Sequence, residues 1–386
     1  MEKLLKPFVV SDKETDDGHR AHFLGHKNDL AVPFSVAGLR DMAQDLSLSS
    51  ADTECFDALV TSLENENRLP YSWTPQEQHF VDHNPKDLIV PYIIYRYKFR
   101  TLPQLREITK TPVHVAIEPA SLCNLRCPMC FQVDKTFTQG YPMGLMEVDL
   151  FKDIIDQAEQ GGTGAITIGS RGEPFLNKNL GEMLRFVSDK KSFFDVKINT
   201  NATKMEEQDC HDLLSSNLNL IILSIDAHEK ELYEAIRVRA NFEQVLENVR
   251  RLHEIRKKHY PDSRAESRIS GVHIREEQDE EGFREFWSEY CDNIVYVRAQ
   301  ERWDTYGNSV HPDNNSPCLF LWERLLVCFD GTCNPCDEDY KTMLSPGNIK
   351  ETPLAEIWQG PEMVKIRKDH LTDQRNCHMP CDRCGV

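Results

Sequence analysis

The run Ile117-Glu-Pro-Ala-Ser-Leu-Cys123-Asn-Leu-Arg-Cys127-Pro-Met-Cys130 carries the most informative pattern in this chain, three cysteines spaced as C-x3-C-x2-C. An apolar, strand-like stretch, residues 113–117, leads directly into it. Thiolates are soft ligands that suit iron–sulfur clusters. A four-iron cluster held by three local thiolates leaves one iron open to a reactant. The pattern therefore predicts a catalytic cluster rather than a closed electron-transfer centre.

Two other uses of these cysteines fit less well. A zinc ion needs four ligands, which usually come as two C-x2-C or C-x2-H pairs, and three cysteines within eight residues do not supply them. A disulfide framework is disfavoured because the chain is long, lacks a secretory signal and has 13 cysteines, an odd number.

This cysteine run resembles the signature of the radical S-adenosylmethionine (radical SAM) enzymes, and the resemblance covers residues 111–386. The residue before the third cysteine is often aromatic in that family and is Met129 here, a large apolar side chain that can also cover a cluster. The resemblance implies a [4Fe-4S] cluster with SAM at its open iron. It also implies reductive cleavage of SAM to a 5′-deoxyadenosyl radical that takes hydrogen from a substrate carbon.

The charge and composition of the chain disfavour two classes of binding partner. The chain has 386 residues with 45 Lys and Arg against 63 Asp and Glu, a net charge of −18. An acidic protein is a poor partner for nucleic-acid phosphates and for anionic membrane surfaces. We find no apolar run as long as a bilayer span and no signal-peptide core near Met1. These features predict a cytoplasmic location, where thiolates and clusters persist.

The chain is expected to have three parts. Residues 1–110 form a mainly helical extension of unknown role, with helix-like stretches at 36–46 and 53–63 and an aromatic run at 89–99. We expect that aromatic run to pack the extension against the next part rather than to bind a peptide. Residues 111–305 alternate between strand and helix patterns, which implies an α/β fold with a parallel sheet. Residues 306–386 hold most of the remaining cysteines.

Six strands are expected in the middle part, at residues 113–117, 165–168, 194–199, 220–225, 269–274 and 294–297. That number fits the partial (βα)6 barrel of TIM type that the resemblance implies. Functional sites in such folds lie at the C-terminal ends of the strands. Polar motifs follow several of these strands at that end.

The first such motif is Gly169-Ser-Arg-Gly-Glu-Pro174, directly after the second strand. It resembles the Gly-Gly-Glu-Pro turn whose backbone binds the amino group of SAM, with Arg171 in place of the first glycine. By this resemblance Gly172 and Glu173 are cofactor-binding residues, and Gly172 keeps the option of a close backbone approach to a ligand.

The third and fourth strands also end in polar residues. By resemblance, Asn199, Asn201, Ser224 and Asp226 reach the ribose and methionyl parts of SAM, and Arg237 meets its carboxylate, which suits a bidentate guanidinium. Asp226 has an equally good alternative as a helix cap. Arg237 has the alternative of a surface salt bridge.

The C-terminal cysteines resemble the auxiliary-cluster extension called SPASM in its long form and twitch in its short form. The short form holds one auxiliary [4Fe-4S] cluster, and its four ligands map onto Cys318, Cys336, Cys381 and Cys384. Other cysteines that a second cluster would need fit the long form poorly; these are Cys328, Cys333 and Cys377. A four-cysteine zinc site is the main alternative for the tail.

Relatives with one auxiliary cluster include dehydrogenases of sugars and aminocyclitols, so a small polyol-like substrate and an auxiliary cluster that takes the second electron are expected. The electron donor would be of the flavodoxin or ferredoxin type. Peptide modification, sugar epimerisation and a zinc-stabilised binding protein are the alternatives. Weak catalytic candidates are Arg298 and Arg302 after the sixth strand and the spare cysteines Cys210 and Cys291.

Overall fold

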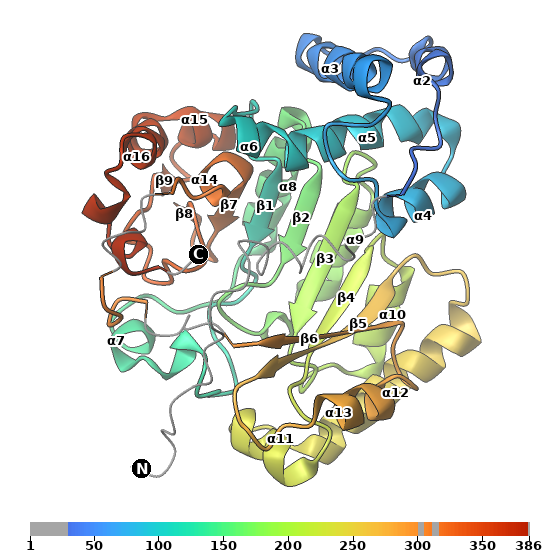
Figure 1. Ribbon diagram of the computed structural model, residues 1–386. Coiled ribbons are helices and arrows are strands. Elements are labelled where there is room, and N and C mark those ends of the chain that lie inside the picture. Colours follow the sequence, from blue (N-terminus) through green and yellow to red (C-terminus); the bar gives the residue numbers. More distant parts are fainter. Residues whose placement is uncertain (1–29, 300–304, 311–315, 385–386) are drawn as a thin grey trace. The chain divides into compact units, whose positions relative to one another are not determined.

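The computed structural model describes residues 30–299, 305–310 and 316–384. The chain divides into two compact units, one within residues 14–109 and a larger one that begins at Lys110. Figure 1 shows helices in the first unit and a twisted sheet flanked by helices in the second. No helix in the described ranges is long and apolar enough to cross a lipid bilayer.

The smaller unit is helical over the residues described. Its helices are α2 (Val36–Ala43), α3 (Ser50–Glu66), α4 (Pro75–His83), α5 (Lys86–Arg100) and α6 (Leu102–Leu105). The predicted aromatic run lies in α5, where the ring of Tyr92 stacks on Phe80 of α4 with the ring centroids 3.6 Å apart. Tyr92, Ile93 and Tyr95 are buried, so this run helps to build the core of the helical unit itself.

Strands and helices alternate through the larger unit, as the sequence predicted. The first six strands are β1 (His114–Ile117), β2 (Ala165–Ile168), β3 (Asp195–Thr200), β4 (Leu220–Ser224), β5 (Glu266–His273) and β6 (Asn293–Arg298). The helices between them are α7 (Lys135–Thr138), α8 (Val148–Gly161), α9 (Leu180–Ser188), α10 (Glu207–Ser215), α11 (Lys230–Ile236), α12 (Phe242–His259) and α13 (Glu280–Trp287). Each strand pairs in parallel with the next along the chain.

A seventh parallel strand, which the six-strand prediction did not include, continues this sheet. Strand β7 (Arg324–Val327) pairs in parallel with β1, and His114 lies opposite Arg324. The pairing partner was not predictable because β7 and β1 are separated by about two hundred residues in the chain.

The C-terminal segment extends the same sheet. Strands β8 (Thr332–Asn334) and β9 (Gly347–Asn348) extend the sheet beyond β7 in antiparallel pairing, and β7 and β8 are joined by the Asp330-Gly331 turn, where Gly331 has φ 91°. The helices here are α14 (Phe320–Glu323), α15 (Leu354–Gln359) and α16 (Pro361–Leu371). The sheet runs from β6 at one edge to β9 at the other and does not close, as a partial barrel requires.

The two faces of the barrel strands differ in polarity. On β3, Val196 and Ile198 are buried in the core that packs on the helices, while Lys197 and Asn199 alternate with them on the opposite face. The same alternation places Arg268 and Ser270 of β5 opposite the buried Ile269. The inner face of the sheet is therefore polar, and the polar motifs follow the C-terminal ends of the strands.

Candidate cluster and cofactor site

Three cysteines gather in the loop that follows β1. Cys127 is buried, and Cys123 and Cys130 are partly exposed. The backbone N–H of Cys130 donates to the carbonyl of Cys127 at 3.0 Å, and the N–H of Leu125 donates to Sγ of Cys123 at 3.4 Å. These local bonds turn the loop tightly, which brings the sulfurs of the C-x3-C-x2-C pattern into one neighbourhood.

The protonation state of these thiols indicates what they can hold. Burial raises the pKa of Cys123 to about 11 and that of Cys130 to about 12, and the neighbouring cysteine sulfurs add to both shifts. The chain alone thus keeps them as neutral thiols, whereas a metal ligand must be a thiolate. Bound iron supplies the positive charge that removes the protons. The donor set fits a cluster with three protein ligands.

The turn after β2 lies directly against this cysteine loop. The N–H of Glu173 donates to the carbonyl of Leu122 at 2.8 Å. A Cβ at Gly172 would meet the carbonyl oxygens of Ala120 and Leu122 at 2.2 and 2.4 Å. The glycine is therefore needed for a contact between two loops of the chain, a different reason from the ligand approach that the sequence suggested.

The Glu173 carboxylate holds the end of β3. It accepts hydrogen bonds from the Thr200 hydroxyl at 2.6 Å, from the Asn201 N–H at 2.7 Å and from the Phe175 N–H at 3.2 Å. Its side chain is buried. Both oxygens are engaged within the protein, so Glu173 positions the strand end rather than presenting a free carboxylate.

Asn201 connects that strand end to the cysteine loop. Its Nδ2 donates to the Asn124 side chain at 3.2 Å and lies 3.9 Å from Sγ of Cys123. Asn199, two residues earlier, lies on the inner face of β3. Of the predicted cofactor residues from β3, the structure brings Asn201 to the cysteine loop.

Asp226 and Arg237 form a buried ion pair beside the loop. Nε of Arg237 lies 2.5 Å from Oδ2 of Asp226, whose side chain has no exposed surface. The other Asp226 oxygen accepts from the N–H of Val272 at 2.9 Å. Helix α11 has Glu229 as its N-cap, so the alternative role of Asp226 as a helix cap is wrong.

The alternative in which Arg237 only forms a surface salt bridge is also wrong. Burial raises the pKa of Cys127, and Arg237 is the nearby charge that lowers it, so the guanidinium lies close to a predicted cluster ligand. The N–H of Arg126 donates to the carbonyl of Val238 at 3.0 Å, which fixes this segment against the cysteine loop. Ser224 pairs in register with Ser270 at the end of β4, and Met129 packs on the apolar core.

Glu173 should give the apoprotein a pH-dependent stability. Burial raises its pKa from 4.5 to about 6, against hydrogen bonds that lower it. Between these two values the native state binds more protons than the unfolded chain, so the free energy of unfolding falls by about 2 kcal/mol as the pH rises through this window. Glu173→Gln should remove that slope in urea unfolding of the apoprotein. An equal slope in parent and variant would contradict the prediction.

The four predicted auxiliary ligands also share one neighbourhood. Burial raises the pKa of Cys336 and of Cys381, and Cys318 and Cys384 add to both shifts. No three Cys, His, Asp or Glu side chains in the described ranges lie close enough to ligate a single metal ion. The sulfurs around a four-iron cluster are farther apart than those around one zinc ion, so this set is compatible with a cluster.

Two residues beside the auxiliary cysteines had no signal in the sequence. Arg375 is 2% exposed and donates to the carbonyls of Ser316 at 2.9 Å and of Cys384 at 3.3 Å. Nδ1 of His370 accepts from the N–H of Cys318 at 3.3 Å. Neither residue belongs to a spacing pattern, and only folding brings them to the site.

Other cysteines and arginines lie elsewhere. Cys210 is a residue of α10 whose side chain is buried in the core, and Cys291 lies just before β6, at the opposite end of the strands from the cysteine loop. Arg298 ends β6 and is exposed, while Arg302 falls outside the described residues. The structure does not gather these four weak catalytic candidates.

The three extra tail cysteines differ in their surroundings, although Cys328 and Cys333 lie near each other across the β7–β8 hairpin. Cys333 packs in the apolar core and Cys377 is exposed. Cys328 is buried where the charges of Glu118 and Arg171 act on its pKa.

Comparison with known families identifies two domains in this chain. The family model for the radical SAM superfamily matches residues 117–285, from the end of β1 into α13. The chain contains a radical SAM domain. The model for SPASM, an iron-sulfur cluster-binding domain, matches residues 318–385 and begins at Cys318. This radical SAM protein therefore uses a [4Fe-4S] cluster and SAM and carries an auxiliary-cluster domain.

Curated relatives match part of this radical SAM chain. A tungsten-containing aldehyde ferredoxin oxidoreductase cofactor-modifying protein of Pyrococcus furiosus is 33% identical over 114 residues, 29% of this chain and 30% of that protein. A GTP 3′,8-cyclase of Chlorobaculum tepidum is 29% identical over 144 residues, 37% of this chain and 42% of that protein. The chain spans less than half the length of these relatives.

Solved radical SAM structures share the fold. Streptococcus suis SuiB, bound to precursor peptide SuiA, superposes with a TM-score of 0.51 at 16% identity, over 83% of this chain and 84% of that one. At this identity the similarity shows the architecture alone.

Proposed function

We propose that this protein is a radical SAM oxidoreductase that dehydrogenates a small sugar- or polyol-like molecule. When bound, the cluster and SAM supply a 5′-deoxyadenosyl radical that takes a hydrogen atom from a substrate carbon, and the auxiliary cluster takes the second electron. The observation that carries the proposal is the presence of two separate cysteine sets in one open barrel, Cys123, Cys127 and Cys130 in the first and Cys318, Cys336, Cys381 and Cys384 in the second.

The chain's own residues would bind and orient SAM. Arg237 is fixed by Asp226 at 2.5 Å and reaches toward Cys127, where a guanidinium suits a carboxylate. Asn201 lies beside Cys123 and offers an amide for polar groups of SAM. Glu173 holds the backbone at the end of β3 in place. Residues fixed by buried partners keep a ligand oriented at little entropic cost.

Two features favour a small molecule as substrate. A four-ligand auxiliary set resembles the short form of the extension, and by that resemblance relatives with one auxiliary cluster include dehydrogenases. GTP 3′,8-cyclases, by their name, act on a nucleotide, which is also a small molecule. We further propose a cytoplasmic location and a donor of the flavodoxin or ferredoxin type.

The test is substrate-dependent formation of 5′-deoxyadenosine by the reduced, reconstituted protein with SAM. We expect a sugar or aminocyclitol from a panel to stimulate it, with deuterium passing from a labelled substrate carbon into deoxyadenosine. Stimulation by peptides alone would replace this proposal with peptide modification. Absence of deoxyadenosine under every condition would overturn radical SAM catalysis by this chain.

A further inference from the structure

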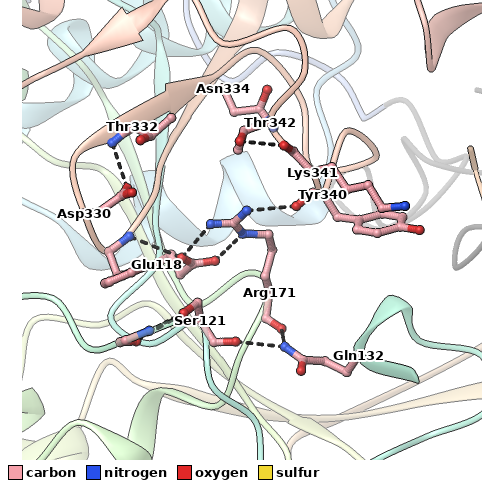
Figure 2. A network of polar contacts seen from close by, with 12 residues as sticks. Glu118, Ser121, Gln132, Arg171, Asp330, Thr332, Asn334, Tyr340, Lys341 and Thr342 are labelled. Carbon is pink, nitrogen blue, oxygen red and sulfur yellow. Dashed lines mark hydrogen bonds and ion pairs between the residues drawn. The ribbon is translucent and has the colours of Figure 1, made fainter. Parts of the chain in front are cut away.

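Arg171 takes the place of a glycine in the turn after β2, and its side chain is buried in a polar network (Figure 2). Its Nη2 donates to Oε1 of Glu118 at 2.8 Å, and its Nε donates to the other oxygen of the same carboxylate. Glu118 directly follows β1 and precedes the cysteine loop. The two charges form a bidentate pair, the strong geometry for a guanidinium and a carboxylate.

The same pair reaches the C-terminal segment. Nη1 of Arg171 donates to the carbonyl of Tyr340 at 2.8 Å, and the N–H of Phe329 donates to Oε1 of Glu118 at 3.2 Å. Phe329 and Tyr340 flank, in sequence, the stretch that carries Cys336, a predicted auxiliary ligand. Both members of the ion pair thus bond to backbone on either side of that ligand.

The backbone of Arg171 is tied to the cysteine loop as well. Its carbonyl accepts from Nε2 of Gln132 at 2.6 Å, and the same Nε2 donates to the carbonyl of Ser121 at 2.8 Å (Figure 2). Ser121 and Gln132 lie two residues outside the first and last cysteines of the motif. One residue, Arg171, therefore joins the cofactor turn, the cysteine loop and the auxiliary hairpin.

Aromatic rings surround this junction. The Arg171 guanidinium lies 5.5 Å from the centre of the Phe137 ring. The ring of Tyr340 stacks on Phe131 with the centroids 4.9 Å apart, and its hydroxyl donates to Asp134 at 2.9 Å. Buried behind these rings, the ion pair is weakly screened by water and salt.

We propose that Arg171 is a positioning residue that couples the SAM-binding turn to the auxiliary-cluster hairpin, so that SAM affinity depends on the auxiliary site. This inference rests on the proposed function, because it takes the turn at Gly172 and Glu173 as part of the SAM site. A hairpin displaced by loss of its cluster would shift Phe329 and Tyr340, and through Arg171 it would shift the turn. By linkage, SAM would in turn stabilise the auxiliary site.

The test is a cycle of SAM dissociation constants on anaerobically reconstituted protein. One arm removes the auxiliary site with Cys381→Ser and Cys384→Ser. The other arm removes the Arg171–Glu118 ion pair with Glu118→Gln and Arg171→Met, so that neither partner is left as an unpaired buried charge. In the parent background, loss of the auxiliary site should weaken SAM binding about tenfold, within the usual range of coupling. In the charge-free background it should change SAM binding less than about twofold.

Three further variants control this experiment. Arg171→Lys keeps a charge beside Glu118 but not the bidentate fork, so it should fold and should lose most of the coupling. Arg185→Met with Asp212→Asn removes an ion pair between α9 and α10, 3.1 Å long and partly exposed, and should leave the coupling intact. Glu173→Gln should weaken SAM binding whether or not the coupling exists.

The outcomes separate the inference from the proposed function. The coupling would be overturned if loss of the auxiliary site still weakened SAM binding tenfold in Arg171→Lys and in the Glu118→Gln, Arg171→Met variant. It would also be overturned if loss of the auxiliary site did not change SAM binding in the parent. In either case SAM cleavage by the parent would still support the proposed function. A parent that binds and cleaves no SAM would overturn both.

Discussion

Replacing Cys123, Cys127 and Cys130 together with alanine should lower the iron content from about eight to about four atoms per chain, as expected for two four-iron clusters. It should also reduce SAM cleavage below detection, because these three cysteines are the thiols that the described residues bring to the loop beside Arg237. The measurement is iron and sulfide per chain on anaerobically purified protein, with the visible spectrum and a deoxyadenosine assay.

Cys377→Ala is the matched control, since Cys377 is exposed and should ligate no iron. If instead the parent held about four iron atoms and the triple cysteine variant held none, with zinc retained, the C-terminal segment would be a zinc module. That result would remove the basis for a dehydrogenase. About twelve atoms in the parent would indicate a second auxiliary cluster.

Arg237→Met should destabilise the protein by about 3–5 kcal/mol, because it leaves the Asp226 carboxylate buried without its partner. Asp226 has no exposed surface and keeps one hydrogen bond, from the N–H of Val272 at 2.9 Å. The same variant should weaken SAM binding, since the guanidinium proposed to meet the SAM carboxylate is absent. Urea unfolding and equilibrium SAM binding measure the two effects.

The double variant Asp226→Asn with Arg237→Met separates stability from binding. The asparagine Oδ1 can still accept from Val272 and no buried charge remains, so most of the lost stability should return. SAM affinity should stay low in the double variant. If both properties returned together, Arg237 would be a structural residue and its place in the SAM site would be wrong.

Local patterns determined the elements of this protein. The stretch predicted at 165–168 matches β2, because a short apolar run indicates a buried strand. Strand β5 begins three residues earlier than predicted, at Glu266, because Glu266, Ser267 and Arg268 are polar on both faces of the strand and carry no apolar alternation. The cysteine spacings indicated both cluster sites and the radical SAM family, since ligand spacing is a property of the sequence itself.

Only the tertiary structure decided which distant groups meet. Nothing in the sequence pairs Glu118 with Arg171, Asp226 with Arg237, or β7 with β1, because charge pairs and strand partners far apart in the chain carry no local pattern. Gly172 shows the difference most clearly. The sequence suggested a glycine that lets a ligand approach, and folding instead places the carbonyls of Ala120 and Leu122 where its Cβ would be. Spacing along the chain determines which ligands are available, whereas long-range packing determines what surrounds them.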